Sequence, residues 1–97
     1  MSGDARPATH TLETLRREIA RIDREILTLV AARTRLAREI GAAKQEAGLR
    51  VLDPQQEAAV VRRAAATARE LELPDQEVRE IFWQLIALSR RTQRERE

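Results

Sequence analysis

The stretch from Leu12 to Ala43, LETLRREIARIDREILTLVAARTRLAREIGAA, carries an apolar residue at nearly every third or fourth position. These positions are Leu12, Leu15, Ile19, Ile22, Ile26, Leu29, Leu36, Ile40 and Ala43. The spacing is that of a heptad seam on one long amphipathic helix, and it holds for about four heptads without a proline. The sequence therefore predicts a helix from about Thr11 to Glu46. At ~1.5 Å per residue, such a helix is roughly 50 Å long.

This predicted helix is too long for the rest of the chain to cover. The chain has 97 residues, which favours a single domain with a modest core. A continuous apolar seam needs a partner surface, and the sequence after it offers only two shorter helices. We therefore expect a homodimer from packing alone.

The segment AGLRVLDP separates the long helix from the next one. Gly48 suits a helix C-cap, Asp53 suits an N-cap, and Pro54 suits the first helical position. A second helix is predicted from about Pro54 to Leu71, and its apolar face carries Ala58, Val61, Ala65 and Ala68. After a turn around Pro74, a third helix is predicted from about Asp75, with an apolar face made by Val78, Ile81, Phe82, Leu85 and Ile86.

The predicted fold class is all-α, with one long and two shorter helices, because the chain shows no strand pattern and no internal repeat. The helical domain is expected to span residues 11–94. Residues 1–10 are expected to form a flexible N-terminal tail, and residues 95–97 a flexible C-terminal end.

The composition excludes several classes of function. There is no cysteine, which excludes a disulfide framework and thiolate metal sites, and the one histidine, His10, lies in the polar leader, which argues against a His-based metal centre or catalytic triad. Aromatic residues make up 2%, the net charge is +2, and acids are interleaved with the basic residues, so a nucleic-acid surface is not indicated. No apolar run approaches the roughly 18 residues of a membrane span, and the leader lacks the apolar run of a secretory signal. A cytoplasmic protein without membrane or nucleic-acid partners is expected.

Polar side chains interrupt two of the apolar faces. Arg33 occupies a seam position of the long helix, where burial of a guanidinium without a partner is costly, so an anionic group should meet it. That group is either a ligand or a glutamate of a dimer partner. Ser89 and Gln93 continue the inward face of the third helix, and they either line a cavity or belong to a frayed last turn.

The basic residues of the long helix fall into two sets. Lys44 follows Arg33 by about three turns, so both project from nearly the same face, with Cα atoms ~16 Å apart. Two long side chains can bracket a small molecule across that gap. Arg16 precedes Arg33 by ~25 Å along the axis and points elsewhere, so it can join the same site only from a second copy of the chain.

Two acidic residues open the second helix. Asp53 is expected to be an N-cap, and Gln56 could complete a capping box with it. Glu57 either faces inward or favours the helix dipole.

Four motifs together resemble the all-α chorismate mutases. They are L-R-R-E-I-x-R-I-D-R-E-I-L-x-L-V-x-x-R from Leu15, R-x-x-L-A-R-E-I-G-x-x-K from Arg33, L-D-P-x-x-E from Leu52 and S-x-x-T-Q from Ser89. The resemblance covers residues 11–94. It implies an intertwined three-helix homodimer that rearranges chorismate to prephenate in aromatic amino-acid biosynthesis, without a cofactor or a metal.

The resemblance also implies roles for particular residues. Arg33 and Lys44 would bind substrate in one subunit, and Arg16 would reach the same site from the other. Asp53 and Glu57 would contact the ring-hydroxyl end of the substrate. Polar residues on the remaining wall would be Ser89 and Gln93. Lys44, Gln93 and Arg33 would be the catalytic residues, with Lys44 and Gln93 near the ether oxygen.

One position departs from the family pattern, since members often carry an arginine where this chain has Gln56. The missing cation leaves open a related enzyme that acts on isochorismate, as a pyruvate lyase, or on 4-amino-4-deoxychorismate. A non-enzymatic helical dimerisation module, with Arg33 in a buried ion pair, is also left open.

Overall fold

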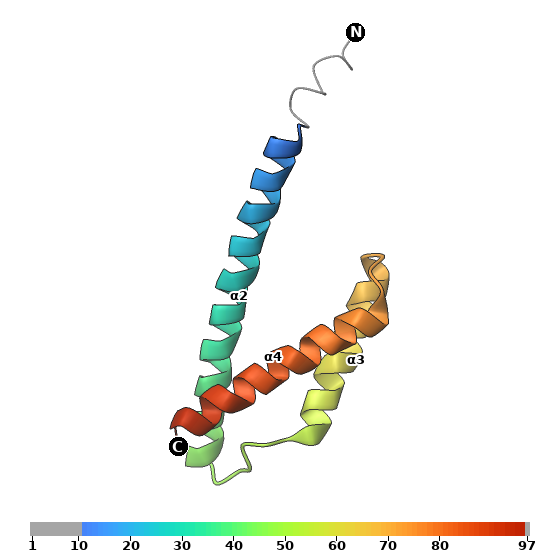
Figure 1. Ribbon diagram of the computed structural model, residues 1–97. Helices are drawn as coiled ribbons and strands as arrows, with labels where there is room; N and C mark the ends of the chain where they lie inside the picture. Colours follow the sequence, from blue (N-terminus) through green and yellow to red (C-terminus); the bar gives the residue numbers. More distant parts are fainter. Residues whose placement is uncertain (1–10, 97) are drawn as a thin grey trace. The chain divides into compact units, whose positions relative to one another are not determined.

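The computed structural model describes residues 11–96 and contains three helices (Figure 1). They are α2 (Leu12–Glu46), α3 (Pro54–Glu70) and α4 (Asp75–Arg96). The all-α prediction, with one long and two shorter helices, is therefore confirmed. The expected tail, residues 1–10, lies outside the described residues, as does residue 97. Helix α4 runs two residues past position 94, where the helical domain was expected to end.

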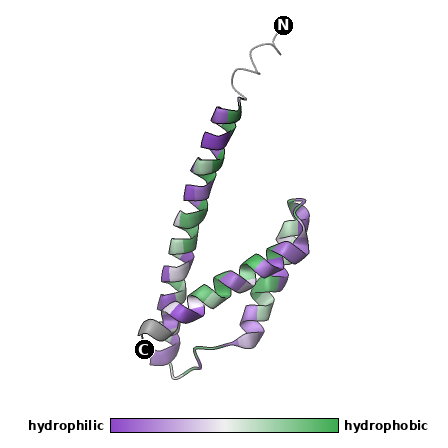
Figure 2. Cartoon of the chain, viewed as in Figure 1, coloured by the Kyte–Doolittle hydropathy of each residue, from purple (hydrophilic) through white to green (hydrophobic). Residues whose placement is uncertain are grey.

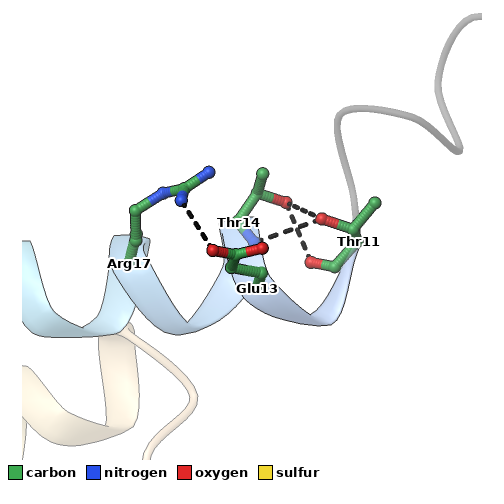
Figure 3. Close-up of polar contacts among 4 residues, drawn as sticks. All are labelled: Thr11, Glu13, Thr14 and Arg17. Carbon is green, nitrogen blue, oxygen red and sulfur yellow. Dashed lines mark hydrogen bonds and ion pairs between the residues drawn. The ribbon is translucent and has the colours of Figure 1, made fainter.

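Helix α2 begins at a threonine cap. The main-chain N–H of Thr14 donates to Thr11 Oγ1 at 3.2 Å, and the Thr14 hydroxyl donates to the Thr11 carbonyl at 2.8 Å (Figure 3). Glu13 pairs with Arg17 one turn later at 3.2 Å. Thr11 is therefore the N-cap, because its side chain accepts a main-chain N–H of the first turn.

Helix α2 ends in a Schellman motif built on a glycine. Gly48 has a φ of 73°, the N–H of Leu49 donates to the Lys44 carbonyl at 2.8 Å, and the N–H of Gly48 donates to the Gln45 carbonyl at 3.1 Å. The predicted role of Gly48 at this helix end is confirmed.

Helix α3 ends in the same motif, but a glutamate takes the glycine position. Glu72 has a φ of 60°, the N–H of Leu73 donates to the Ala68 carbonyl at 2.8 Å, and the N–H of Glu72 donates to the Arg69 carbonyl at 3.2 Å. A non-glycine residue in this region of backbone space carries a steric cost.

The chain divides into two units, one up to Ala32 and one from Arg33 onward, and each is described by itself. In the second unit, α3 packs against α4 (Figure 1). Its buried apolar residues are Val61, Ala64, Ala65, Ala68 and Ile86. Most of the buried side chains are therefore methyl groups, which allow two helix backbones to approach closely. On the apolar face predicted for α3, Ala58 is only half-buried.

In the first unit, the apolar seam of α2 is exposed. Leu12 is 63% exposed, Ile19 is 59% exposed and Leu29 is 69% exposed. Hydrophobic residues recur along α2 (Figure 2). Side chains of this size stabilise a fold only when they are removed from water, so the seam has surface left to bury.

No helix in the described part of the chain is both long enough and apolar enough to cross a membrane.

Candidate active site

A cavity of about 350 Å³ lies in the second unit, between the C-terminal part of α2, the start of α3 and the end of α4. All the predicted site residues except Arg16 border it, namely Arg33, Lys44, Asp53, Glu57, Ser89 and Gln93. Arg16 is exposed and belongs to the first unit. The polar residues that interrupt the apolar faces in the sequence, Arg33, Ser89 and Gln93, therefore border the same cavity.

Arg33 is half-buried on the cavity wall and contacts two uncharged groups. Its Nη1 donates to Ser89 Oγ at 3.2 Å, and its Cζ lies 5.9 Å from the centre of the Phe82 ring. The hydroxyl orients the guanidinium, and the ring face attracts the cation. Because neither contact carries a negative charge, the positive charge of Arg33 remains available to an anionic ligand.

Ser89 and Gln93 tie the end of α4 to α2. Ser89 is buried and accepts the hydrogen bond from Arg33, and Gln93 Nε2 donates to the Ala37 carbonyl at 2.8 Å. The alternative prediction of a frayed last turn is wrong at these positions, since both side chains make specific contacts across the site.

A buried glycine makes room for Gln93. A Cβ atom on Gly41 would lie 3.3 Å from Gln93 Cγ, which is tighter than ordinary van der Waals contact, and 3.4 Å from Gln93 Nε2. Gly41 is helical, so it is needed here for space and not for an unusual backbone angle.

Lys44 lies in the last turn of α2 and reaches the following loop. Its Nζ donates to the Val51 carbonyl over a long 3.4 Å. An ammonium group has three donors, so this contact leaves donors for a ligand in the cavity.

The start of α3 contributes both carboxylates. Asp53 is the N-cap, since its Oδ1 accepts the main-chain N–H of Gln56 at 3.2 Å, as predicted. The Glu57 side chain is 16% exposed and forms an ion pair with Arg90 of α4. Of the two orientations left open by the sequence, the inward one is correct for Glu57.

Sequence reasoning missed three residues of the site, Arg63, Arg90 and Gly41. A helical-face argument had the information for Arg90, because it lies three residues before Gln93 and four after Ile86. The same argument applies to Arg63, which follows Gln56 by seven residues, about two turns, and so shares its face of α3. Nothing in the sequence alone indicates that Gly41 faces a glutamine.

The cavity is chemically suited to an anion that also carries a hydroxyl group. Four cationic residues border it, Arg33, Lys44, Arg63 and Arg90, against the carboxylates of Asp53 and Glu57. Guanidinium groups hold carboxylates with defined geometry, and carboxylates accept hydrogen bonds from hydroxyl groups. Among the described residues, no cluster of three or more His, Cys, Asp or Glu side chains could hold a metal ion.

The comparison with known protein families agrees with this chemistry. The family model described as chorismate mutase type II matches residues 15–94. The chain belongs to the chorismate mutase type II family. The match includes every residue of the cavity wall and also Arg16. No curated protein and no solved structure matches the chain.

Proposed function

We propose that this chorismate mutase family member converts chorismate to prephenate. The observation that carries the proposal is the cavity bordered by Arg33, Lys44 and Gln93, in which the guanidinium of Arg33 contacts the uncharged groups described above. The family match supports the choice of chorismate as the anion.

The reaction is a unimolecular rearrangement, so the protein has to hold a flexible dianion in a compact reactive conformation. Arg33 binds one substrate carboxylate with its planar fork, which a lysine would not match. As the C–O bond breaks, the ether oxygen gains negative charge, and Lys44 and Gln93 donate hydrogen bonds to it. Asp53 and Glu57 accept hydrogen bonds from the ring-hydroxyl end. No nucleophile is required.

We also propose that the working unit is a homodimer in which Arg16 completes the site of the partner. Two observations support this. The seam of α2 exposes large apolar side chains, including Leu15 and Ile26, which a second copy can bury. Arg16 itself is exposed, and it lies in the first unit, 17 residues before Arg33 on α2.

The test is loss of chorismate on addition of the purified protein, with the product identified by chromatography. We expect prephenate at an enzymatic rate. Arg33→Ala and Lys44→Ala should nearly abolish turnover, because removal of one transition-state donor typically costs roughly 10²–10³ in rate. Circular dichroism should show that both variants retain their helices. Turnover near that of the wild type in either variant would remove that residue from the mechanism.

A related reaction is favoured by one observation, the exposed Gln56 at a position where an arginine is frequent in the family. Isochorismate and 4-amino-4-deoxychorismate should therefore be compared with chorismate under the same conditions. Faster turnover of either compound would identify that compound, in place of chorismate, as the substrate. Inertness toward all three would leave a helical dimerisation module.

A further inference from the structure

Arg90 of α4 holds the carboxylate of Glu57 of α3 with two donors. Arg90 Nε donates to Glu57 Oε2 at 2.9 Å, and a terminal nitrogen of Arg90 donates to Glu57 Oε1. Both residues border the cavity. The hydrogen bond from Arg90 to Glu57 raises the pKa of the guanidinium above its ordinary value, so Arg90 stays charged beside the site.

This pair differs from an ordinary surface ion pair in its location. The Glu57 side chain is 16% exposed, whereas the glutamate side chains of the surface pairs Glu13–Arg17 and Glu25–Arg21 are 81% and 63% exposed. Exposed pairs stabilise a protein little. A two-donor contact to a largely buried carboxylate instead fixes the direction of its remaining lone pairs.

We propose that Arg90 is a positioning residue, which fixes Glu57 as the hydrogen-bond acceptor for the substrate's ring hydroxyl. Arg90 also supplies, from α4, a positive charge beside Glu57. The neighbour of Glu57 on α3, Gln56, is uncharged. This inference rests on the proposed function, since it assigns to Glu57 the hydroxyl end of chorismate.

Steady-state kinetics of single and double variants separate this role from its competitors. Arg90→Met should lower kcat/KM by roughly 10- to 100-fold, the size of effect expected when a substrate-positioning group shifts by ~1 Å. The loss should fall mainly on KM, because the ring hydroxyl takes no part in bond making and is bound alike in the ground and transition states. Arg90→Lys keeps the charge without the fork and should lose less.

The double variant decides whether Arg90 acts through Glu57. When Glu57 is already alanine, Arg90→Met should reduce kcat/KM little further, because two residues that act as one unit have non-additive effects. Arg91→Met is the matched control, since Arg91 is an exposed neighbour that does not border the cavity, and it should leave kcat and KM unchanged.

The outcomes are distinguishable. An Arg90→Met variant with wild-type kinetics would overturn the proposal and leave a merely structural pair. Equal losses with and without Glu57 would also overturn it, because Arg90 would then contact the substrate directly. A wild-type protein that turns over neither chorismate nor its analogues would instead remove the proposed function, and this inference with it.

Discussion

In the proposed mechanism, Gln93 donates a hydrogen bond to the ether oxygen from an uncharged amide. One of its two N–H groups is held by the Ala37 carbonyl at 2.8 Å, and the amide donates at any pH. We therefore expect turnover by the wild type to vary little across neutral pH. Gln93→Glu should be active only at acidic pH, because its carboxyl group donates when protonated and repels both the Ala37 carbonyl and the ether oxygen when ionised.

The sign of this prediction follows from the ordinary pKa of glutamate, about 4.3. Turnover by Gln93→Glu should be present below the pKa of the new carboxyl group and fall as the pH rises through it. The measurement is kcat against pH for both proteins. Superimposable profiles would exclude a contact between residue 93 and the reacting oxygen.

Gly41 offers a second test of the same side chain, from the opposite helix. Gly41→Ala should displace Gln93, since the added Cβ would lie 3.3 Å from its Cγ. Turnover should fall, whereas the helix itself gains up to ~1 kcal/mol from the replacement of an interior glycine. The expected combination is a lower kcat with an unfolding midpoint that is not lowered. Unchanged kinetics would mean that Gln93 accommodates the methyl group without moving.

Several residues that border the cavity were predicted from single positions in the sequence. Arg33, Ser89 and Gln93 interrupt apolar faces, and such an interruption is visible in a pattern with helical period. Arg90 and Gly41 interrupt no pattern, because an arginine and a small residue are both ordinary on a helix. The helical face of α4 could have placed Arg90 at the site. Its pairing with Glu57, like the contact of Gly41 with Gln93, depends on which residue of another helix lies opposite, and the pattern of a single helix does not show that.

At the scale of the elements, the ends of α2 and α3 use one motif with two different residues. Gly48 has a φ of 73° and Glu72 a φ of 60°, each at the position after the helix cap. Glu72→Gly should therefore stabilise the fold, by about 0.5–1 kcal/mol after the extra backbone freedom of glycine in the unfolded chain is subtracted. Thermal unfolding measures this shift. Gly48→Ala is the converse control and should destabilise, whereas a loss of stability in Glu72→Gly would contradict the steric argument.

Helix limits were the most predictable feature, because they depend on local chemistry. Pro54, Asp53 and Gly48 mark their positions through fixed φ, side-chain capping and a left-handed turn. The end of α3 was placed well even though Glu72 gives no such signal, since Pro74 soon follows and limits where a helix can continue.

At the scale of the whole molecule, the proposed dimer predicts complementation between two inactive variants. In that dimer, Arg16→Ala and Arg33→Ala would damage the same site from different chains. Random exchange of subunits at equal concentration should give half heterodimers, each with one intact site, and thus about a quarter of wild-type activity. Each variant alone should stay inactive. If mixing and subunit exchange restore nothing, Arg16 and Arg33 act in the same chain or Arg16 is not in the site.

The sequence indicated this assembly only indirectly. The seam of α2 predicted that a partner is needed, and the exposed leucines and isoleucines agree with that need. In the proposed dimer, the place of Arg16 in the site depends on two chains, so the periodicity of one sequence cannot give it.

The methyl-lined contact between α3 and α4 has a consequence for how this site can change over generations. The face of α3 that sets the spacing of the two helices carries the buried residues Ala64, Ala65 and Ala68. Helix α4 carries the cavity residues Ser89, Arg90 and Gln93. A bulkier residue at one of these alanines would push α4 outward and widen the cavity while every polar group kept its identity. Drift toward a larger ligand can therefore begin in the apolar interior, at positions outside the cavity wall.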